Sequence, residues 1–455
     1  MPVNSTHPKY DATKLKWKVV RDCVAGQEAM QKGDYLPKFD PPDEKRDEAY
    51  VARALYVNVT GRTLNSLVGA VFRKDMAVDV PPDVEYIDTN ADSAGNSLEQ
   101  FSKDLVSNLV SVGRHGILTD YPDVVGTPTA EEVALAGLRP YLSSYTAESI
   151  INWHTDNNGR LDLVVLQESV EDSEDEFSAV DVNQFRVLRL RNKVYTQQLY
   201  DKDLQPVTEE MTPRKADGST WSEIPFIITG SVNNDPNIDP VTLYDLAVVN
   251  VAHFRNSADY EEGVFLHGQP MLHIDTGTMS ADEWKQLNPN GVSVGARRGV
   301  VTAGGGAAEL MQAESNGAAF EAMKHKEDQM VQIGARLVER GGSNQTAEAV
   351  RTESAAEHSV LETLVTNAQD AIVRAVRWCV EFAGGDPAAV DIKLNDDFFD
   401  TPPDATMLAQ LMGLESSGII SKPVIIAYLR RTGVVPDDMT DEDILNSISN
   451  SGPGA

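Results

Sequence analysis

The sequence predicts an α+β protein. Apolar residues recur at helical spacing in residues 14–75 and again in residues 316–385, whereas from Arg139 to Gly230 their spacing shifts towards two. Turn signals such as DNNGR and RKADGS separate the strand-like stretches of that middle part. Helical and strand-like blocks together indicate an α+β organisation.

The length and the net charge of the chain limit the range of possible functions. A chain of 455 residues has the length of about two to four domains and enough apolar residues for a sizeable core. Its net charge of -31, with clusters at residues 171–176 and 437–443, opposes binding to nucleic-acid phosphates and argues against a sequence-specific DNA reader. Two interpretations of the acidity stay open: it keeps the protein soluble, or it forms a functional acidic surface.

Cysteine usage and targeting signals point to a reducing compartment. Cys23 and Cys379 are too few for a disulfide framework or a metal quartet. The N-terminus lacks the apolar core of a signal peptide, and no apolar run reaches the ~18 residues of a membrane span. We expect no membrane association.

The first half should begin with helices and continue with strands. We expect helices in residues 14–75, including one continuous run over residues 47–75, and another helix over residues 97–120. The expected strands are RPYLSSYTAESIINWHTD, LDLVVLQESV, QFRVLRLRNKVYTQQLYD and EIPFIITG.

A helix over residues 239–265 follows, and a small mixed insert comes after it. The helix places an apolar face on Leu243, Ala247, Val251, Phe254 and Ala258. In the insert we expect a strand, PMLHID, then a helix with a capping box of Ser280 and Glu283, then short strands between residues 291 and 315.

Two helices hinged at the short loop GGSNQT are the most distinctive feature of the chain. They cover residues 316–340 and 347–382, and the second would be roughly 54 Å long at 1.5 Å per residue. Its first half, from Ala347 to Glu357, is small and polar and should face a neighbouring subunit or solvent. Its second half should be buried through an apolar stripe of Leu361, Leu364, Val365, Ala368, Ala371, Ile372, Ala375, Val376, Cys379 and Val380.

The C-terminal part should contain one strand and three short helices. We expect the strand VDIKLNDDFF to lie beside the sheet of the first domain. The helices are expected in TPPDATMLAQLMGLESSG, SKPVIIAYLRRTG and TDEDILNSI.

No catalytic motif rises above background, so we expect no enzyme, no cofactor and no metal. The GGG of residues 304–306 lacks the helix and Lys or Ser/Thr of a phosphate-binding loop. His154 has no nucleophile tied to it, and His267 with His273 lacks a further ligand at metal spacing. The acidic group Asp396, Asp397 and Asp400 reads as a solvated strand end, with Mg²⁺ binding as the less favoured alternative.

The order of these elements resembles the portal proteins of tailed bacteriophages. RPYLSSYTAESIINWHTDNNGRLDLVVLQES and FRVLRLRNKVYTQQLYD resemble the wing, DLAVVNVAHFRNSADYEEGVFLHGQPMLHI resembles the first stem helix leading to the clip, and IGARLVERGGSNQTAEAVRTESAAEHSVL resembles the second stem helix, tunnel loop and long helix. The likeness covers residues 14 to about 447. Few residues follow the return strand, so any crown is short.

The resemblance implies a division into portal domains. These are the first part of the wing (1–235), stem helix (236–267), clip (268–314), second stem helix (315–340), tunnel loop (341–346), long wing helix (347–384), wing return strand (385–401) and short helical crown with flexible tail (402–455).

The resemblance also implies a function and partners. Portal proteins form a ring of twelve subunits at one capsid vertex of the virion, assembled in the host cytoplasm, through which double-stranded DNA passes without sequence specificity. Their partners are terminase, major capsid and scaffolding proteins, and head-tail adaptor or tail proteins. Twelve helices of about 10 Å diameter side by side would leave a bore of roughly 28 Å. Twelve chains of net charge -31 carry -372, which favours sliding of DNA over retention.

Basic and loop residues are the candidate site positions. The tunnel loop facing DNA is expected at Arg340, Gly341, Gly342, Ser343, Asn344 and Gln345, with an ordinary helix connector as the alternative. Arg297 and Arg298 are the expected docking surface of the clip. Lys324, Lys326 and Arg336 are candidates to face the channel, with plain surface solvation as the alternative. Two other functions stay open, a helical scaffold or adaptor that forms no ring and a hydrolase with an unrecognised site.

Overall fold

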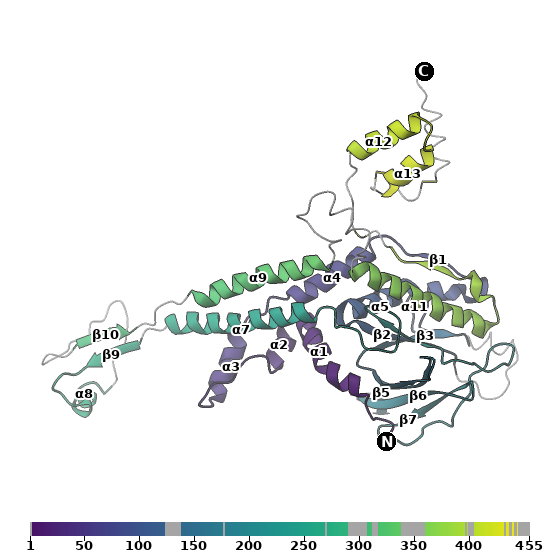
Figure 1. Cartoon of the computed structure of the whole chain (residues 1–455). Helices are drawn as coiled ribbons and strands as arrows, with labels where there is room; N and C mark the ends of the chain where they lie inside the picture. The colour runs from purple at the N-terminus through teal and green to yellow at the C-terminus, as the bar shows by residue number, and fades with distance from the viewer. Residues whose placement is uncertain are drawn as a thin grey trace. The chain divides into compact units, whose positions relative to one another are not determined.

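The chain forms two compact units. The computed structural model (Figure 1) describes residues 2–122, 138–175, 178–268, 271–289, 307–311, 317–337, 360–395, 398, 405–431, 434–435, 439–440 and 444. Unit 1 comprises Met1–His7, Asn65–Pro240 and Val360–Ala455, and unit 2 comprises Pro8–Leu64 and Val241–Ser359. Helices and antiparallel strands occur in both units, which confirms the α+β class.

Two antiparallel sheets form the middle of unit 1. One has the order β3-β2-β8 and the other the order β4-β5-β6-β7. The strands expected between Arg139 and Gly230 are confirmed. Their bounds are β3 Tyr141–Thr146, β4 Ile150–Thr155, β5 Leu161–Asp175, β6 Ser178–Arg191, β7 Val194–Tyr200 and β8 Phe226–Gly230. Strand β2 (Arg114–Asp120) joins them but was not expected.

Helix α5 (Leu98–Val112) ends earlier than the sequence predicts. The Ser97 side chain accepts a hydrogen bond from the Gln100 amide and caps its start. Gly113 has φ 74°, a left-handed conformation that stops the helix, and the chain continues directly into β2. The expected helix over residues 97–120 is therefore wrong from Arg114 onward, where every residue of β2 is buried in the central strand of its sheet.

Helix α11 (Val360–Ala383) covers the β3-β2-β8 sheet and packs against α5. All ten residues of the predicted apolar stripe are buried, so the prediction for this half of the long helix is confirmed. Two polar contacts fix the helix on the sheet: Thr119 Oγ1 donates to Ala375 O (3.0 Å), and Asn367 Nδ2 donates to Gly230 O (3.0 Å). The polar half expected at residues 347–357 lies outside the described residues.

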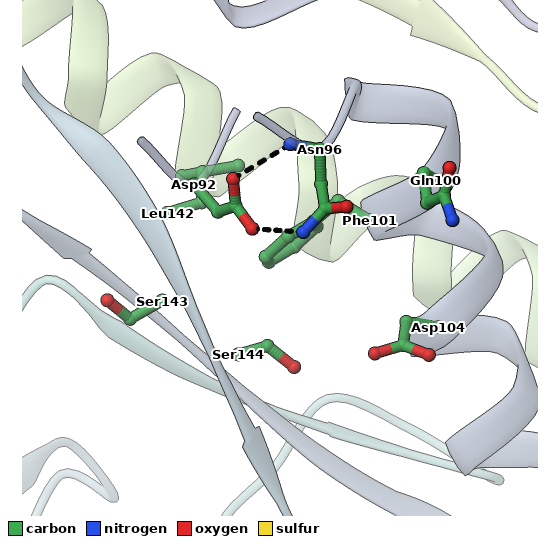
Figure 2. Close-up of a pocket in the computed structure, with 8 residues that line it drawn as sticks. All are labelled: Asp92, Asn96, Gln100, Phe101, Asp104, Leu142, Ser143 and Ser144. Atoms are coloured by element: carbon green, nitrogen blue, oxygen red, sulfur yellow. Dashed lines mark hydrogen bonds between the residues drawn. The ribbon is translucent and has the colours of Figure 1, made fainter. Parts of the chain in front are cut away.

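A pocket opens between α5, the loop before it and β3 (Figure 2). It has a volume of about 330 Å³. The lining side chains come from two segments, residues 92–104 and residues 142–144 of β3.

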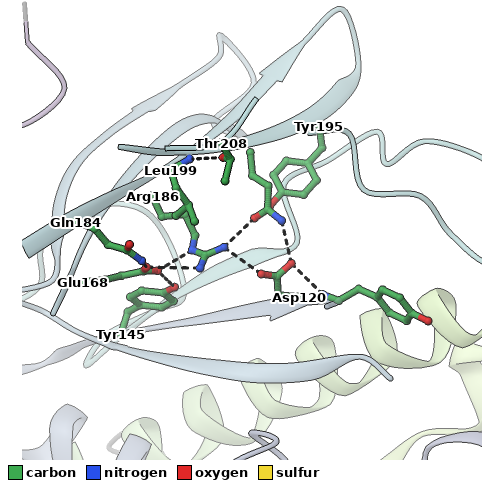
Figure 3. Close-up of polar contacts among 10 residues, drawn as sticks. Asp120, Tyr145, Glu168, Gln184, Arg186, Tyr195, Leu199 and Thr208 are labelled. Carbon is green, nitrogen blue, oxygen red and sulfur yellow. Dashed lines mark hydrogen bonds and ion pairs between the residues drawn. The ribbon is translucent and has the colours of Figure 1, made fainter. Parts of the chain in front are cut away.

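A buried network of charged and polar groups joins the two sheets of unit 1 (Figure 3). The Arg186 guanidinium donates to Glu168 Oε1 (2.6 Å) and lies 3.2 Å from Asp120 Oδ2. Tyr145 and Gln184 also donate to Glu168, each at 2.6 Å. Burial alone would raise the pKa of Glu168, but Arg186 and these hydrogen bonds outweigh it and hold the pKa below its usual value.

The C-terminal strand does not join either large sheet. Strand β11 (Asp391–Lys393) pairs antiparallel with β1 (Ala77–Asp79), from Ala77 opposite Lys393 to Asp79 opposite Asp391. The expectation that this strand extends the main sheet is therefore wrong. Its two-stranded pairing uses a short segment that the sequence pattern left unassigned. Short helices η1 (Pro82–Asp88) and η2 (Pro387–Ala389) flank this pair, and α12 (Ala405–Ser416) and α13 (Lys422–Arg431) follow as predicted.

In unit 2, the expected continuous helix over residues 47–75 is two helices. They are α3 (Glu44–Arg53) and α4 (Val59–Val71), the latter continuing into unit 1. Ala54 is extended (φ -62°, ψ 130°), and Asn58 Oδ1 accepts from the Gly61 amide (2.7 Å) to start the second helix. Helices α1 (Pro8–Ala25) and α2 (Gln27–Lys32) complete the N-terminal part of the unit.

Candidate functional site: the α7–α9 hairpin

Two long helices and a strand pair form the candidate site. Helices α7 (Tyr244–His267) and α9 (Ala318–Arg336) lie side by side in unit 2 (Figure 1), and both were predicted from their periodicity. Between them in sequence, strands β9 (Met271–Asp275) and β10 (Ala307–Met311) pair antiparallel, from Met271 opposite Met311 to Asp275 opposite Ala307. Helix α8 (Ala281–Leu287) has the predicted capping box, since Ser280 and Glu283 exchange hydrogen bonds.

Asn250 holds α7 from a fully buried position. Its Oδ1 accepts from the Tyr56 hydroxyl (2.9 Å), the Thr60 amide (3.1 Å) and the Thr60 hydroxyl (3.0 Å). Its Nδ2 donates to Val57 O (2.9 Å). One side chain thus satisfies the backbone where α3 breaks and α4 begins, which explains why the chain departs from helix there.

A second polar cluster fixes α3 on the later part of α7. Glu262 is nearly buried and forms ion pairs with Arg53 and, at 3.5 Å, with Arg46. The Tyr50 hydroxyl donates to Asp259 Oδ1 (2.6 Å). Because a buried carboxylate needs such partners, the face of α7 that carries Asp259 and Glu262 packs against α3.

Helix α9 contacts α7 through few buried groups. Met330 is its buried apolar residue among those described, and Phe320 lies 5.9 Å from the Tyr260 ring, centroid to centroid. His253, fully buried on α7, places Nε2 3.4 Å from Glu327 Oε1. Most of the α9 surface is left open.

Large apolar side chains are exposed along the hairpin. On α7 they include Leu266 (48%), and on α9 Val331 (69%). Large apolar side chains left exposed on two packed helices favour an interaction surface. We call these residues the hairpin apolar set: Val248, Val264, Phe265, Leu266, Phe320 and Val331.

The predicted site residues fall partly on this hairpin. Lys324 is exposed on α9, with Nζ 4.8 Å from the Phe320 ring centroid, and Lys326 is half-buried on the same helix. Arg336 is the last residue of α9. The expected tunnel loop, Arg340 to Gln345, and the expected docking pair, Arg297 and Arg298, lie outside the described residues.

His154 and His273, which were weighed for catalysis and metal binding, lie in separate sheets. The His154 side chain is exposed, with Nδ1 2.7 Å from Asp162 Oδ1, and the two residues lie on the paired strands β4 and β5. His273 lies on β9 opposite Glu309. Within the described part of the chain, no group of three or more His, Cys, Asp or Glu side chains is placed to hold a metal ion. Asp396, Asp397 and Asp400 lie outside it.

None of the helices described here is both long and apolar enough to cross a membrane.

Sequence reasoning missed Asn250. The signal was available, because Asn250 is a polar residue between Ala247 and Val251 on the predicted apolar face of its helix. A polar residue at such a position needs buried partners, but the sequence does not say which.

Comparisons with known proteins bear on the region around the hairpin and on the whole chain. A family described as a domain of unknown function, DUF4055, matches residues 242–383, the span from the start of α7 to the end of α11. None of the curated proteins compared matches the chain. Among solved structures, the chain is similar to a chain in the neck of an empty GTA particle computed with C6 symmetry. The identity is 13%, the match covers 84% of this chain and 91% of that one, and the TM-score is 0.41.

Proposed function

We propose that the protein is a bacteriophage portal protein: a closed ring of about twelve copies at one capsid vertex of a virion, which conducts double-stranded DNA during packaging and ejection. The proposal starts from the sequence resemblance. The order of elements in the described chain agrees with it, since a helix, a small strand-paired insert, a second helix and a buried long helix follow one another.

The observation that carries the proposal is the hairpin apolar set. The helices that carry them contact α1, α3 and each other. Phe265 packs against Arg53 of α3 and Phe320 lies beside Tyr260 of α7, so the free surface consists mainly of Val248, Val264, Leu266 and Val331. Burying a large aliphatic side chain contributes about 1.5–3 kcal/mol. A ring gives each hairpin a neighbour on either side, so this surface would be covered by copies of the same chain.

The net charge of the chain agrees with a channel through which DNA passes. The chain carries -31, so a ring wall repels phosphates over most of its area. Lys324, Lys326 and Arg336 on α9, and the loop Arg340 to Gln345 after it, are the positions we assign to weak, sequence-independent contacts with the duplex. In this proposal the protein has no enzymatic activity, and Arg297 and Arg298 bind terminase first and head-tail adaptor or tail proteins later.

The experiment is electron microscopy and sedimentation of purified protein at micromolar concentration. Wild type should form rings with a central hole. Replacing Leu266 and Val331 together by Asp should convert rings to smaller species with unchanged circular dichroism, because two carboxylates would replace buried apolar area. The matched control is Val207→Asp in unit 1, which is similarly exposed and should leave rings intact.

A monomer in both preparations, even with scaffolding protein added, would instead favour the non-ring scaffold or adaptor. The loop assignment is tested separately by replacing Gly341 and Gly342 with Pro, which should leave rings but reduce packaged DNA. Replacing Arg297 and Arg298 by Glu should leave rings but weaken capture of terminase or adaptor.

A further inference from the structure

The pocket of unit 1 has a mixed polar and apolar lining (Figure 2). Phe101 and Leu142 are buried and supply an apolar floor. Its volume of about 330 Å³ lies at the lower end of the range for small-ligand sites, ~300–1,000 Å³. The polar lining consists of Asp92, Asn96, Gln100, Asp104, Ser143 and Ser144.

The lining contains two carboxylates and no cationic side chain. Asp92 is fixed in its loop, where it accepts from the Ala94 amide (2.9 Å), the Asn96 amide (3.1 Å) and Asn96 Nδ2 (2.6 Å). Burial alone would raise the pKa of Asp92, but these hydrogen bonds lower it, so the carboxylate stays charged. Asp104 lies on α5 across the pocket from Ser144 of β3 and is exposed.

The hydroxyl side of the pocket is fixed by a buried ring. His115, which is 0% exposed on β2, lies 3.0 Å from Ser144 Oγ through Nε2. A hydroxyl held from behind in this way presents a defined acceptor or donor to the pocket. Two carboxylates and the Ser144 hydroxyl line one space, which favours a hydrogen-bond donor of positive charge.

We infer that this pocket receives an arginine side chain of a partner protein. A planar guanidinium has five donors in fixed directions, which match carboxylate and hydroxyl acceptors on opposite walls, while its methylene stem and flat face fit an apolar floor such as Phe101 and Leu142. An anion would be repelled by the two carboxylates of the lining, Asp92 and Asp104. For a metal ion the lining offers two carboxylates, and among the described residues no group of three or more His, Cys, Asp or Glu side chains is placed to hold a metal ion. The inference is independent of the proposed ring.

The test uses the full chain and a peptide, acetyl-Gly-Arg-Gly-amide, with the citrulline analogue as an uncharged isostere. Binding is measured by saturation-transfer NMR and isothermal titration at low salt. The arginine peptide should bind in the millimolar range and the citrulline peptide at least about tenfold more weakly. Asp104→Asn should weaken arginine binding about fivefold or more, and circular dichroism should show the fold intact.

The control is Asp181→Asn, which removes an exposed carboxylate of β6 that does not line the pocket. It should leave binding within about twofold of wild type. Equal binding of the citrulline peptide, an unchanged affinity in Asp104→Asn, or an equal loss in Asp181→Asn would each overturn the inference.

Discussion

Replacing Asn250 by Ala tests whether α7 is held by its buried amide. The change removes all four hydrogen bonds of the side chain. The Tyr56 hydroxyl keeps a partner in Cys23 O at 3.0 Å, and Val57 O keeps the Val59 amide at 2.8 Å, but the amide and the hydroxyl of Thr60 lose theirs. Each buried group left without a partner costs about 1–3 kcal/mol, so we expect a loss of about 2–6 kcal/mol. The better helix propensity of Ala offsets only a few tenths of this.

Native-state hydrogen exchange, followed on peptides that cover α4 and α7, measures this loss of stability locally. A loss of about 2 kcal/mol speeds exchange through the opened state roughly 30-fold, since 1.4 kcal/mol is tenfold. The matched control is Asn256→Ala on the same helix, a half-buried position, where we expect a change within about 0.5 kcal/mol. Protein concentration must be equal in all samples, because assembly adds stability. Exchange in Asn250→Ala no faster than in the control would refute the reasoning.

Three further predictions concern unit 1 and the cysteines. The pKa of Glu168 is lower in the folded protein than the unfolded value of about 4.3, so its charge stabilises the fold above that pH and the stabilisation is lost as the pH falls through the folded pKa. The urea midpoint of Glu168→Gln should therefore change less between pH 6 and 3 than that of wild type. Parallel curves for the two proteins would contradict this. Gly113→Ala should lower stability by about 2–4 kcal/mol in a thermal melt, because φ is 74° and a Cβ would lie 2.5 Å from Pro240 O. An unchanged melting temperature would show that the turn relaxes. Burial raises the pKa of Cys23 to about 11 and also raises the pKa of Cys379, so neither thiol should react with a thiol reagent at pH 8 until the protein is unfolded. Rapid labelling of the native chain would contradict this prediction.

Long periodic elements could be predicted from the sequence, and short or interrupted ones could not. The stripe of α11 and the capping box of α8 depend on spacing within one segment, so both were found. The continuation of α5 past Gly113 was predicted wrongly, because RHGILTD has no alternation once a strand is buried on both faces. A three-residue strand such as β1 carries too few residues for any period.

The candidate sites show the same limit. The hairpin helices were predicted from their own periodicity. Which of their apolar side chains stay exposed depends on how helices distant in the sequence pack against them, so the hairpin apolar set could not be predicted. The sequence analysis did not single out Arg186, whose pairing with Glu168 and Asp120 brings together residues 18 and 66 positions apart. Such contacts need the register of several strands at once.

The interrupted order of unit 1 has a consequence during synthesis. Strands β2 and β8 are made early, but α11, which covers them, begins at Val360, and 129 residues separate it from the end of β8 at Gly230. At ~5–20 residues per second the ribosome needs roughly 6–26 s for that stretch. Throughout this interval α5 packs on the sheet, but the part of its apolar face that α11 covers has no helix, so the nascent chain should bind holding chaperones at this stage. A circular permutant that begins at Val360 would supply α11 first and should need them less.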